Sequence, residues 1–326
     1  MRWFFTKVIL FSAGLALLMS GVDILVTSVT PWRRYQDPRA RILWDGAFDG
    51  TRLVLLGDSL FCSFYVDSPE ETLWARLEAR TGQRVFPGAL NGAKPADLLA
   101  AAVHVSREWP TGATVFIDVG PTRFVDTRVE DPPMGNYPDV FLTQYGIDVD
   151  NDGVLRHLQG QLYRWLLKPF FAARTRSALA NMINGNDYQK PFGNFVWSKD
   201  REFAMARFAF FERNIVLGAS PRPLGWLRDV KKQLEGAGMK PVFVLTPLNE
   251  ALIRSYASLH TSDTLLSHVR EITAAVRTYI ETNRAAFIDF DEGFPPECFS
   301  DLVHTNACGN DLIAARLAEW LSQDRY

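Results

Sequence analysis

Residues 53–60 read LVLLGDSL, and this stretch decides the fold that the chain can adopt. A run of apolar residues leads directly into a glycine, an acid and Ser59. A continuous apolar run of this length is typical of a parallel strand that is covered on both faces. In an α/β fold such a strand delivers its last residues to the carboxyl edge of the sheet, where ligands bind. We therefore expect Ser59 at that edge, where its own N–H can face a developing oxyanion.

Further short apolar runs follow, and amphipathic helical patterns separate them. The predicted strands are residues 52–56, 84–86, 113–119, 241–245 and 286–290. The first predicted helix runs from Ser68 to Arg80, because Ser68 can act as the N-cap, Pro69 suits the first position and Glu71 can complete a capping box. The other predicted helices begin at Pro95 or span residues 222–237, 264–283 and 309–322. This alternation predicts an α/β sheet with right-handed crossovers.

One long stretch, residues 125–220, breaks the alternation and is rich in aromatic residues. We interpret it as a helical insertion that either caps the carboxyl edge of the sheet or forms a satellite core under long loops. Within it, residues 148–153 read DVDNDG and match the first half of a calcium loop. Position twelve of that loop is Gln159 rather than a bidentate glutamate, which favours a polar turn. No metal and no cofactor are predicted for this chain.

A second group of chemically capable residues lies near the carboxyl end, where residues 301–309 read DLVHTNACG. A serine hydroxyl is a weak nucleophile until a base accepts its proton, and a histidine does this near neutral pH. Asp301 stands three residues before His304, so it can orient the ring from the same loop and stabilise the imidazolium. The pattern predicts that Ser59, His304 and Asp301 act together.

With these two blocks, the chain resembles the SGNH/GDSL hydrolase superfamily. The first block matches at residues 57–60, and the last matches at Asp301, His304, Asn306 and Gly309. The resemblance covers residues 51–124 and 240–322. It implies a flavodoxin-like three-layer sandwich with a parallel sheet of about five strands, the SGNH hydrolase fold, and an acyl-serine intermediate on Ser59.

The middle blocks of the superfamily match less well. The resemblance assigns the oxyanion hole to the N–H groups of Ser59 and Gly92. Thr122 stands where the superfamily has an asparagine, and losing one such donor costs about 2.7–4 kcal/mol. Thr122 can donate through its hydroxyl, and Asn249, which follows the fourth predicted strand, is a second candidate for the missing amide.

The first thirty residues differ from the rest of the chain. An apolar run of residues 8–29 follows Arg2 and Lys7, and its length suits a bilayer span of about 20 residues. We favour an uncleaved anchor over a cleavable signal peptide, since no clear cleavage site precedes Asp23. The predicted organisation is an anchor at residues 1–30, a linker at 31–50 and a catalytic domain at 51–326.

The charges around this run give conflicting indications of its orientation. Four arginines follow it, which by the positive-inside rule would place the body in the cytoplasm. The short basic tail before the run and the family resemblance point outward instead. We therefore expect a single-pass protein of the inner (cytoplasmic) membrane with a periplasmic or extracytoplasmic body. In that compartment Cys298 and Cys308 can pair across the Asp301–His304 loop, or they can remain two thiols.

The formal net charge of −2 provides no basic field for nucleic acid. An anchor together with the missing asparagine resembles a subset of the superfamily, the D-alanyl transfer protein of teichoic-acid modification and the alginate O-acetylation proteins. That resemblance implies an esterase or O-acyltransferase for acyl esters of an envelope polysaccharide, working beside a membrane-bound O-acyltransferase. The residues do not choose between hydrolysis and transfer. The alternative is a non-catalytic protein that binds polysaccharide or scaffolds an acyltransferase complex.

Overall fold

The computed structural model describes residues 50–63, 65–90, 93, 95–109, 111–120, 124, 221–260, 264–290 and 294–323, with residue 43 and scattered helical positions between residues 3 and 18. The chain divides into two compact units, Met1–Trp44 with Asp148–Pro191, and Asp45–Ile147 with Phe192–Tyr326. The second unit holds the sheet. The predicted insertion up to residue 220 and the DVDNDG turn lie outside the described residues. The predicted anchor and linker lie largely outside them. Where the chain is described, no helix combines the length and the apolar character needed to cross a bilayer.

The sheet has five strands, all parallel, in the order β2-β1-β3-β4-β5. The strands are β1 (Thr51–Leu56), β2 (Arg84–Pro87), β3 (Thr114–Asp118), β4 (Lys240–Leu245) and β5 (Ala286–Asp289). Each predicted strand is confirmed, with ends that move by one residue at most. This order is that of flavodoxin-like folds, in which ligands bind beside the first strand where the direction of winding reverses.

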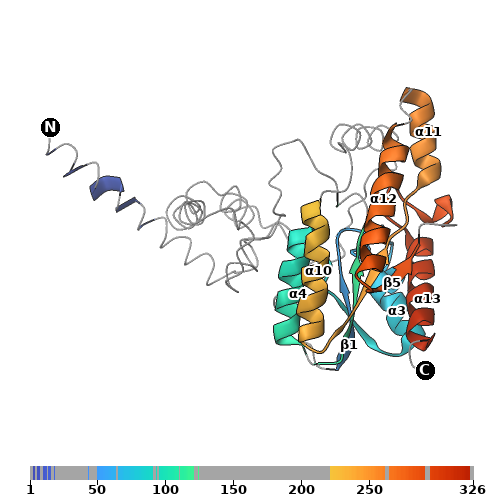
Figure 1. Ribbon diagram of the computed structural model, residues 1–326, viewed down its shortest axis with the longest axis horizontal. Coiled ribbons are helices and arrows are strands. Elements are labelled where there is room, and N and C mark those ends of the chain that lie inside the picture. Colours follow the sequence, from blue (N-terminus) through green and yellow to red (C-terminus); the bar gives the residue numbers. More distant parts are fainter. Residues whose placement is uncertain are drawn as a thin grey trace. The chain divides into compact units, whose positions relative to one another are not determined.

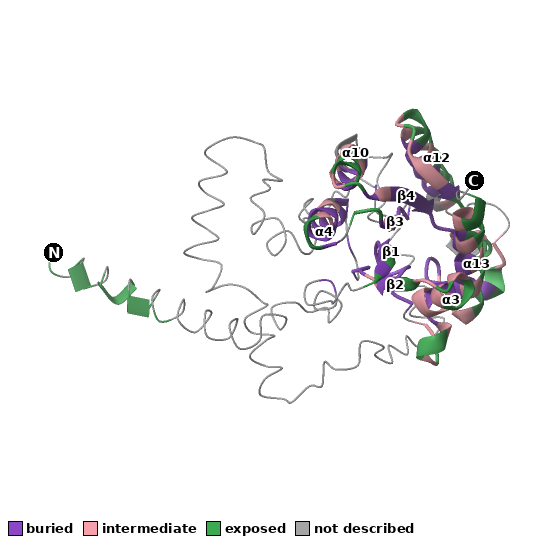
Figure 2. Ribbon diagram, turned by 90° about the horizontal axis from the view of Figure 1, so that it is seen from below, coloured by how far each residue is buried: buried purple, intermediate pink, exposed green. Residues whose placement is uncertain are grey.

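Two helical layers enclose the sheet. The helices are α3 (Leu73–Thr81), α4 (Pro95–Glu108), α10 (Pro221–Gly236), α11 (Glu250–His260), α12 (Thr264–Thr282) and α13 (Ala307–Gln323). Helices α4 and α10 lie side by side on one face of the sheet, and α3 and α13 lie on the other (Figures 1 and 2). The predicted three-layer α/β sandwich is therefore confirmed.

The core between the sheet and the α3/α13 layer explains why the strands read as apolar runs. Alternate strand residues such as Leu53, Leu55 and Phe116 face this layer and are almost fully buried. They pack with Leu73 and Leu77 of α3, and with α13. From Val54 onward the intervening residues of β1 are buried as well, as are those of β3 and β4, so both faces of the central sheet are covered (Figure 2). Burying one such side chain contributes about 1.5–3 kcal/mol.

The start of the first helix differs from the prediction. Pro69–Glu71 forms a single 3₁₀ turn (η2), and α3 begins only at Leu73. The N-cap is Thr72, whose hydroxyl accepts a hydrogen bond from the N–H of Ala75 (3.4 Å). Glu71 does reach back, but to the N–H of Asp67 (2.9 Å), so it tightens the turn before the helix.

Candidate active site

The turn that carries Ser59 is fixed by close packing at Gly57. A Cβ atom at this position would overlap the Cβ of Asp118 at the end of β3. The carbonyl of Gly57 accepts a hydrogen bond from the N–H of Leu90 (2.9 Å), which ties the turn to the segment after β2. Only glycine lets the chain leave β1 this close to β3, and Ser59 follows with 3% of its surface exposed.

Ser59, His304 and Asp301 form one continuous chain of hydrogen bonds. The Oγ of Ser59 lies 2.8 Å from Nε2 of His304, and Nδ1 of the same ring lies 2.7 Å from Oδ2 of Asp301. A carboxylate only accepts, so the proton of the neutral ring resides on Nδ1 and Nε2 is free to accept from the serine hydroxyl. The structure thus brings together the three residues that the sequence predicts as a set, across a separation of 245 positions.

Asp301 is held as a carboxylate by its own loop. Burial raises the pKa of Asp301, but the hydrogen bond and the charge of His304, together with two backbone N–H donors, lower that pKa to well below its usual value. The donors are the N–H groups of Val303 (2.9 Å) and His304 (2.8 Å), both on Oδ1. The carboxylate is therefore charged at neutral pH and oriented before any substrate binds.

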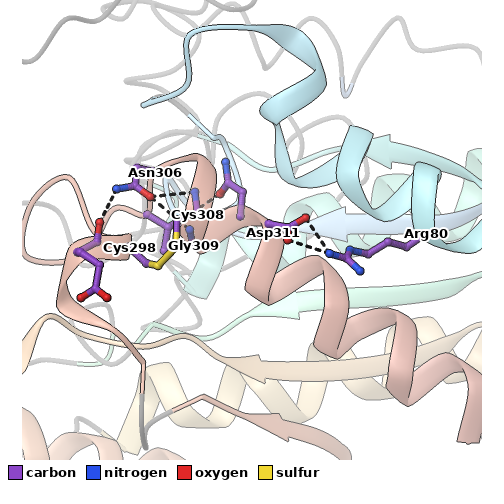
Figure 3. The surroundings of a disulfide bond; sticks show 9 residues. Arg80, Cys298, Asn306, Cys308, Gly309 and Asp311 are labelled. Atoms are coloured by element: carbon purple, nitrogen blue, oxygen red, sulfur yellow. Dashed lines mark hydrogen bonds and ion pairs between the residues drawn. A yellow bond between two sulfur atoms is a disulfide. The ribbon is translucent and has the colours of Figure 1, made fainter.

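The loop that carries Asp301 and His304 is closed on itself. Cys298 and Cys308 form a disulfide with a Cα–Cα distance of 5.0 Å, as the sequence allows (Figure 3). The N–H of Ser300 donates to the carbonyl of His304 (2.8 Å), and the N–H of Asn306 donates to that of Cys298 (3.1 Å). The two catalytic candidates thus lie inside a short covalent ring.

The same loop is joined to the first turn of α13. The Oδ1 of Asn306 accepts from the N–H groups of Cys308 (3.0 Å) and Gly309 (3.3 Å), and its Nδ2 donates to the carbonyl of Glu297 (2.8 Å) (Figure 3). A Cβ at Gly309 would lie 2.5 Å from the carbonyl oxygen of Cys298, which explains why glycine stands there. The Asn306 and Gly309 positions of the last block are therefore structural, and they fix the His304 loop to a helix.

Behind Ser59 lies a buried pair of acids that the sequence reasoning missed. Asp118 occupies the last position of β3, and its side chain is hydrogen-bonded to that of Asp58. Its Oδ1 accepts from the N–H of Gly120 (3.0 Å) and the hydroxyl of Thr246 (2.9 Å), and its Oδ2 from the N–H of Asp58 (3.3 Å). Burial and the neighbouring Asp58 charge raise the pKa of Asp118 well above its usual value. The signal for this pair is a lone acid that ends an otherwise apolar strand.

The predicted oxyanion residues are only partly described. Ser59 belongs to the described site, whereas Gly92 and Thr122 lie outside the described residues. Asn249 is anchored elsewhere, because its Nδ2 donates to the carbonyl of Asp301 (3.3 Å) and its Oδ1 accepts from the N–H of Leu252 (3.1 Å). The Asn249 side chain therefore caps α11 and supports the acid–base loop. Across the described ranges, no group of three His, Cys, Asp or Glu side chains is arranged to hold a metal ion.

Comparisons with known proteins give matches at the level of structure only. No protein-family model and no curated protein matches the sequence. Solved structures that resemble the chain include a GDSL-like lipase from Bacteroides thetaiotaomicron, with 10% identity, a TM-score of 0.40 and coverage of 87% of this chain and 96% of that one. Another is a carbohydrate acetylesterase from Sinorhizobium meliloti, with 12% identity, a TM-score of 0.39 and coverage of 84% and 99%.

Proposed function

We propose that this protein is a serine-dependent esterase or O-acyltransferase of the SGNH/GDSL type. The observation that carries the proposal is the hydrogen-bonded chain from Ser59 through His304 to Asp301. Each atom in it has the role that acyl transfer requires: a hydroxyl nucleophile, an imidazole nitrogen able to accept its proton, and a carboxylate that fixes the ring. All three side chains come from elements that the sheet and α13 hold in place.

In the proposed reaction, the Oγ of Ser59 attacks the carbonyl carbon of an ester while its proton passes to Nε2 of His304. Asp301 stabilises the imidazolium that results. The oxyanion is received by the N–H of Ser59, with Gly92 and Thr122 as the further proposed donors. Collapse of the tetrahedral intermediate breaks the ester C–O bond, and the leaving alkoxide takes the proton from Nε2. Water or a sugar hydroxyl then attacks the acyl-serine, with His304 again accepting the proton. The bond between the acyl carbon and Oγ breaks, and His304 returns the proton to Oγ of Ser59.

The proposed setting is the outer side of the cytoplasmic membrane, with an envelope polysaccharide as the acyl-bearing polymer. Two observations support the location and the anchor, whereas the polysaccharide is carried over from the family resemblance. The Cys298–Cys308 disulfide favours an oxidising compartment. Trp3, Leu10 and Phe11 are helical and exposed, as apolar side chains of a membrane anchor are. A membrane-bound O-acyltransferase is the proposed partner, and its presence would direct the acyl group to transfer rather than to water.

The test is covalent labelling of the full chain with a fluorophosphonate probe, alongside turnover of p-nitrophenyl acetate. Ser59→Ala should abolish both. Ser300→Ala is the matched control, because Ser300 is an exposed serine in the acid–base loop and its replacement should leave both unchanged. If Ser59→Ala is labelled as strongly as the wild type, the assignment is wrong. Absent turnover in the wild type, together with polysaccharide binding that Ser59→Ala leaves unchanged, would favour the non-catalytic alternative.

A further inference from the structure

We propose that Tyr65 is a fourth member of this hydrogen-bonded chain, a positioning residue that holds the Asp301 carboxylate and limits how strongly it attracts a protonated His304. The inference rests on the proposed function and extends it to a residue outside the Ser–His–Asp set. Tyr65 lies in the segment that follows the nucleophile turn, whereas Asp301 and His304 belong to the loop before α13.

The geometry places two donors on one oxygen of Asp301. The hydroxyl of Tyr65 donates to Oδ2 of Asp301 at 3.1 Å, and that same oxygen lies 2.7 Å from Nδ1 of His304. The other oxygen, Oδ1, is already occupied by two backbone N–H groups. Both carboxylate oxygens therefore accept hydrogen bonds, and Tyr65 is a side-chain donor that takes no proton during the proposed reaction.

The backbone fixes Tyr65 in this position. Residue 65 forms a parallel bridge with Asn306, so the segment after Ser59 is paired with the end of the acid–base loop. The tyrosine ring also lies beside the imidazole, with ring centroids 5.2 Å apart and planes inclined by 44°. The contact between hydroxyl and carboxylate thus belongs to the same pairing that brings the Ser59 turn against His304.

The chemical consequence follows from competition at Oδ2. Two donors on one oxygen weaken each other, because each withdraws the electron density that the other needs. When His304 becomes an imidazolium, its bond to Oδ2 strengthens and that of Tyr65 weakens. The phenol therefore stabilises the state with a neutral ring, which is the form that accepts a proton from Ser59. Without the phenol, the carboxylate should attract the imidazolium more strongly.

Titratable groups near the ring come from the acid–base loop, from the segment after the nucleophile turn and from the strand ends behind Ser59. Asp301 lies on the loop of His304, Tyr65 follows the nucleophile turn, and the Asp58–Asp118 pair lies behind Ser59 at the ends of β1 and β3. Tyr65→Phe removes one oxygen and leaves the other groups in place. A change in ring titration after this replacement therefore reports the lost phenol.

The experiment uses full-length Tyr65→Phe with two readouts. The acidic limb of kcat/KM for p-nitrophenyl acetate against pH should move upward by about half to one pH unit, and the plateau should fall roughly threefold to tenfold. The titration midpoint of the His304 Cε1–H signal in NMR, assigned with His304→Asn, should move in the same direction. Tyr279→Phe, the same chemical change on α12, should match the wild type in both.

The two readouts separate this inference from the proposed function. An acidic limb and an NMR midpoint equal to those of the wild type would overturn the role of Tyr65. A shifted midpoint in a protein that shows no turnover would keep the role of Tyr65 while the esterase proposal fails. Should Tyr65→Phe fold poorly, 3-fluorotyrosine at position 65 supplies a stronger donor on the native ring, and the midpoint should then move downward. An unchanged midpoint in that protein would also reject the inference.

Discussion

Replacing Asp118 with asparagine isolates the energetic role of the buried Asp58–Asp118 pair. Burial and the Asp58 charge raise the pKa of Asp118, so the folded chain holds a proton here that the unfolded chain releases near its ordinary pKa. The stabilising contribution of the Asp118 proton is therefore complete below the unfolded pKa and is lost as the pH rises through the folded pKa. The pH window of this loss lies between those two pKa values. Within that window the unfolding free energy of the wild type should fall by about 1.4 kcal/mol per pH unit from this group alone.

The structure also sets the cost of the replacement at low pH. An asparagine Oδ1 can keep the hydrogen bonds from Gly120 and Thr246, and its Nδ2 can donate to Asp58. What is lost is the acceptor for the N–H of Asp58, a long bond of 3.3 Å, at a cost of about 1 kcal/mol. Below the window, Asp118→Asn should be less stable than the wild type. As the pH rises, the wild type loses stability, and the variant should become the more stable of the two within about one pH unit of the start of the window.

Urea unfolding at a series of pH values measures this difference directly. Subtracting the two curves removes the contribution of the titrating groups that are not coupled to Asp118, so the difference reports the Asp58–Asp118 pair. Asp311→Asn serves as the control, because it removes a half-exposed carboxylate that pairs with Arg80 (2.8 Å) and lies outside the Asp58–Asp118 pair, so its difference from the wild type should not reproduce the slope expected for Asp118→Asn. A constant difference between Asp118→Asn and the wild type would show that no extra proton is held, and the reasoning about this pair would be refuted.

Two other replacements probe the acid–base loop. The double variant Cys298→Ser/Cys308→Ser opens a ring whose two ends are ten residues apart, which should cost about 3 kcal/mol of stability and lower the unfolding temperature by roughly 6–12 °C. In calorimetry, dithiothreitol should lower the unfolding temperature of the wild type and leave that of the variant unchanged. Equal responses of the two proteins would contradict the role of the disulfide. Asp301→Asn should lower kcat on the order of 10³–10⁴-fold at neutral pH, because the fixed tautomer of His304 is lost. Since the pKa of Asp301 is lowered by folding, the stability that it provides is present above its ordinary pKa and is lost as the pH falls through the folded value. Urea unfolding should therefore show the gap in unfolding free energy between the wild type and Asp301→Asn narrowing in acid, and a gap that stays constant as the pH falls would contradict this assignment.

The strands were predictable because each one is a continuous apolar run, and continuous runs arise when both faces of a sheet are covered. The pairing of Ser59 with His304 was predictable from residue types alone, since the carboxyl ends of parallel strands share one edge. The start of α3 was not, because Ser68 and Thr72 are both good caps and only the packed structure decides between them. Helix α11 was missed, although Asn249 followed by Glu250 is a usable start signal.

Asp118 and Tyr65 show why part of the site was beyond the sequence. Each acts through one contact with a residue far along the chain, Asp118 with Asp58 and Tyr65 with Asp301. Nothing in the local pattern around either residue specifies that partner. An acid at the end of a strand or a tyrosine in a turn is common, and only the approach of two segments gives it a role. The assignment of Gly92 and Thr122 to the oxyanion hole stays a prediction, as do the anchor and the domain boundaries.

The distance between Ser59 and His304 along the chain also determines when the site comes into existence during synthesis. The nucleophile leaves the ribosome with the first strand of the sheet, whereas His304 and α13 are the last of the described elements to be made. Helix α13 also completes the cover over Leu73, Leu77 and Phe116, so one late docking step both closes this face of the core and delivers the base. A nascent chain that ends before the loop of His304 carries Ser59 without the proton acceptor of the proposed reaction, and one that ends before α13 lacks the helix that fixes this loop.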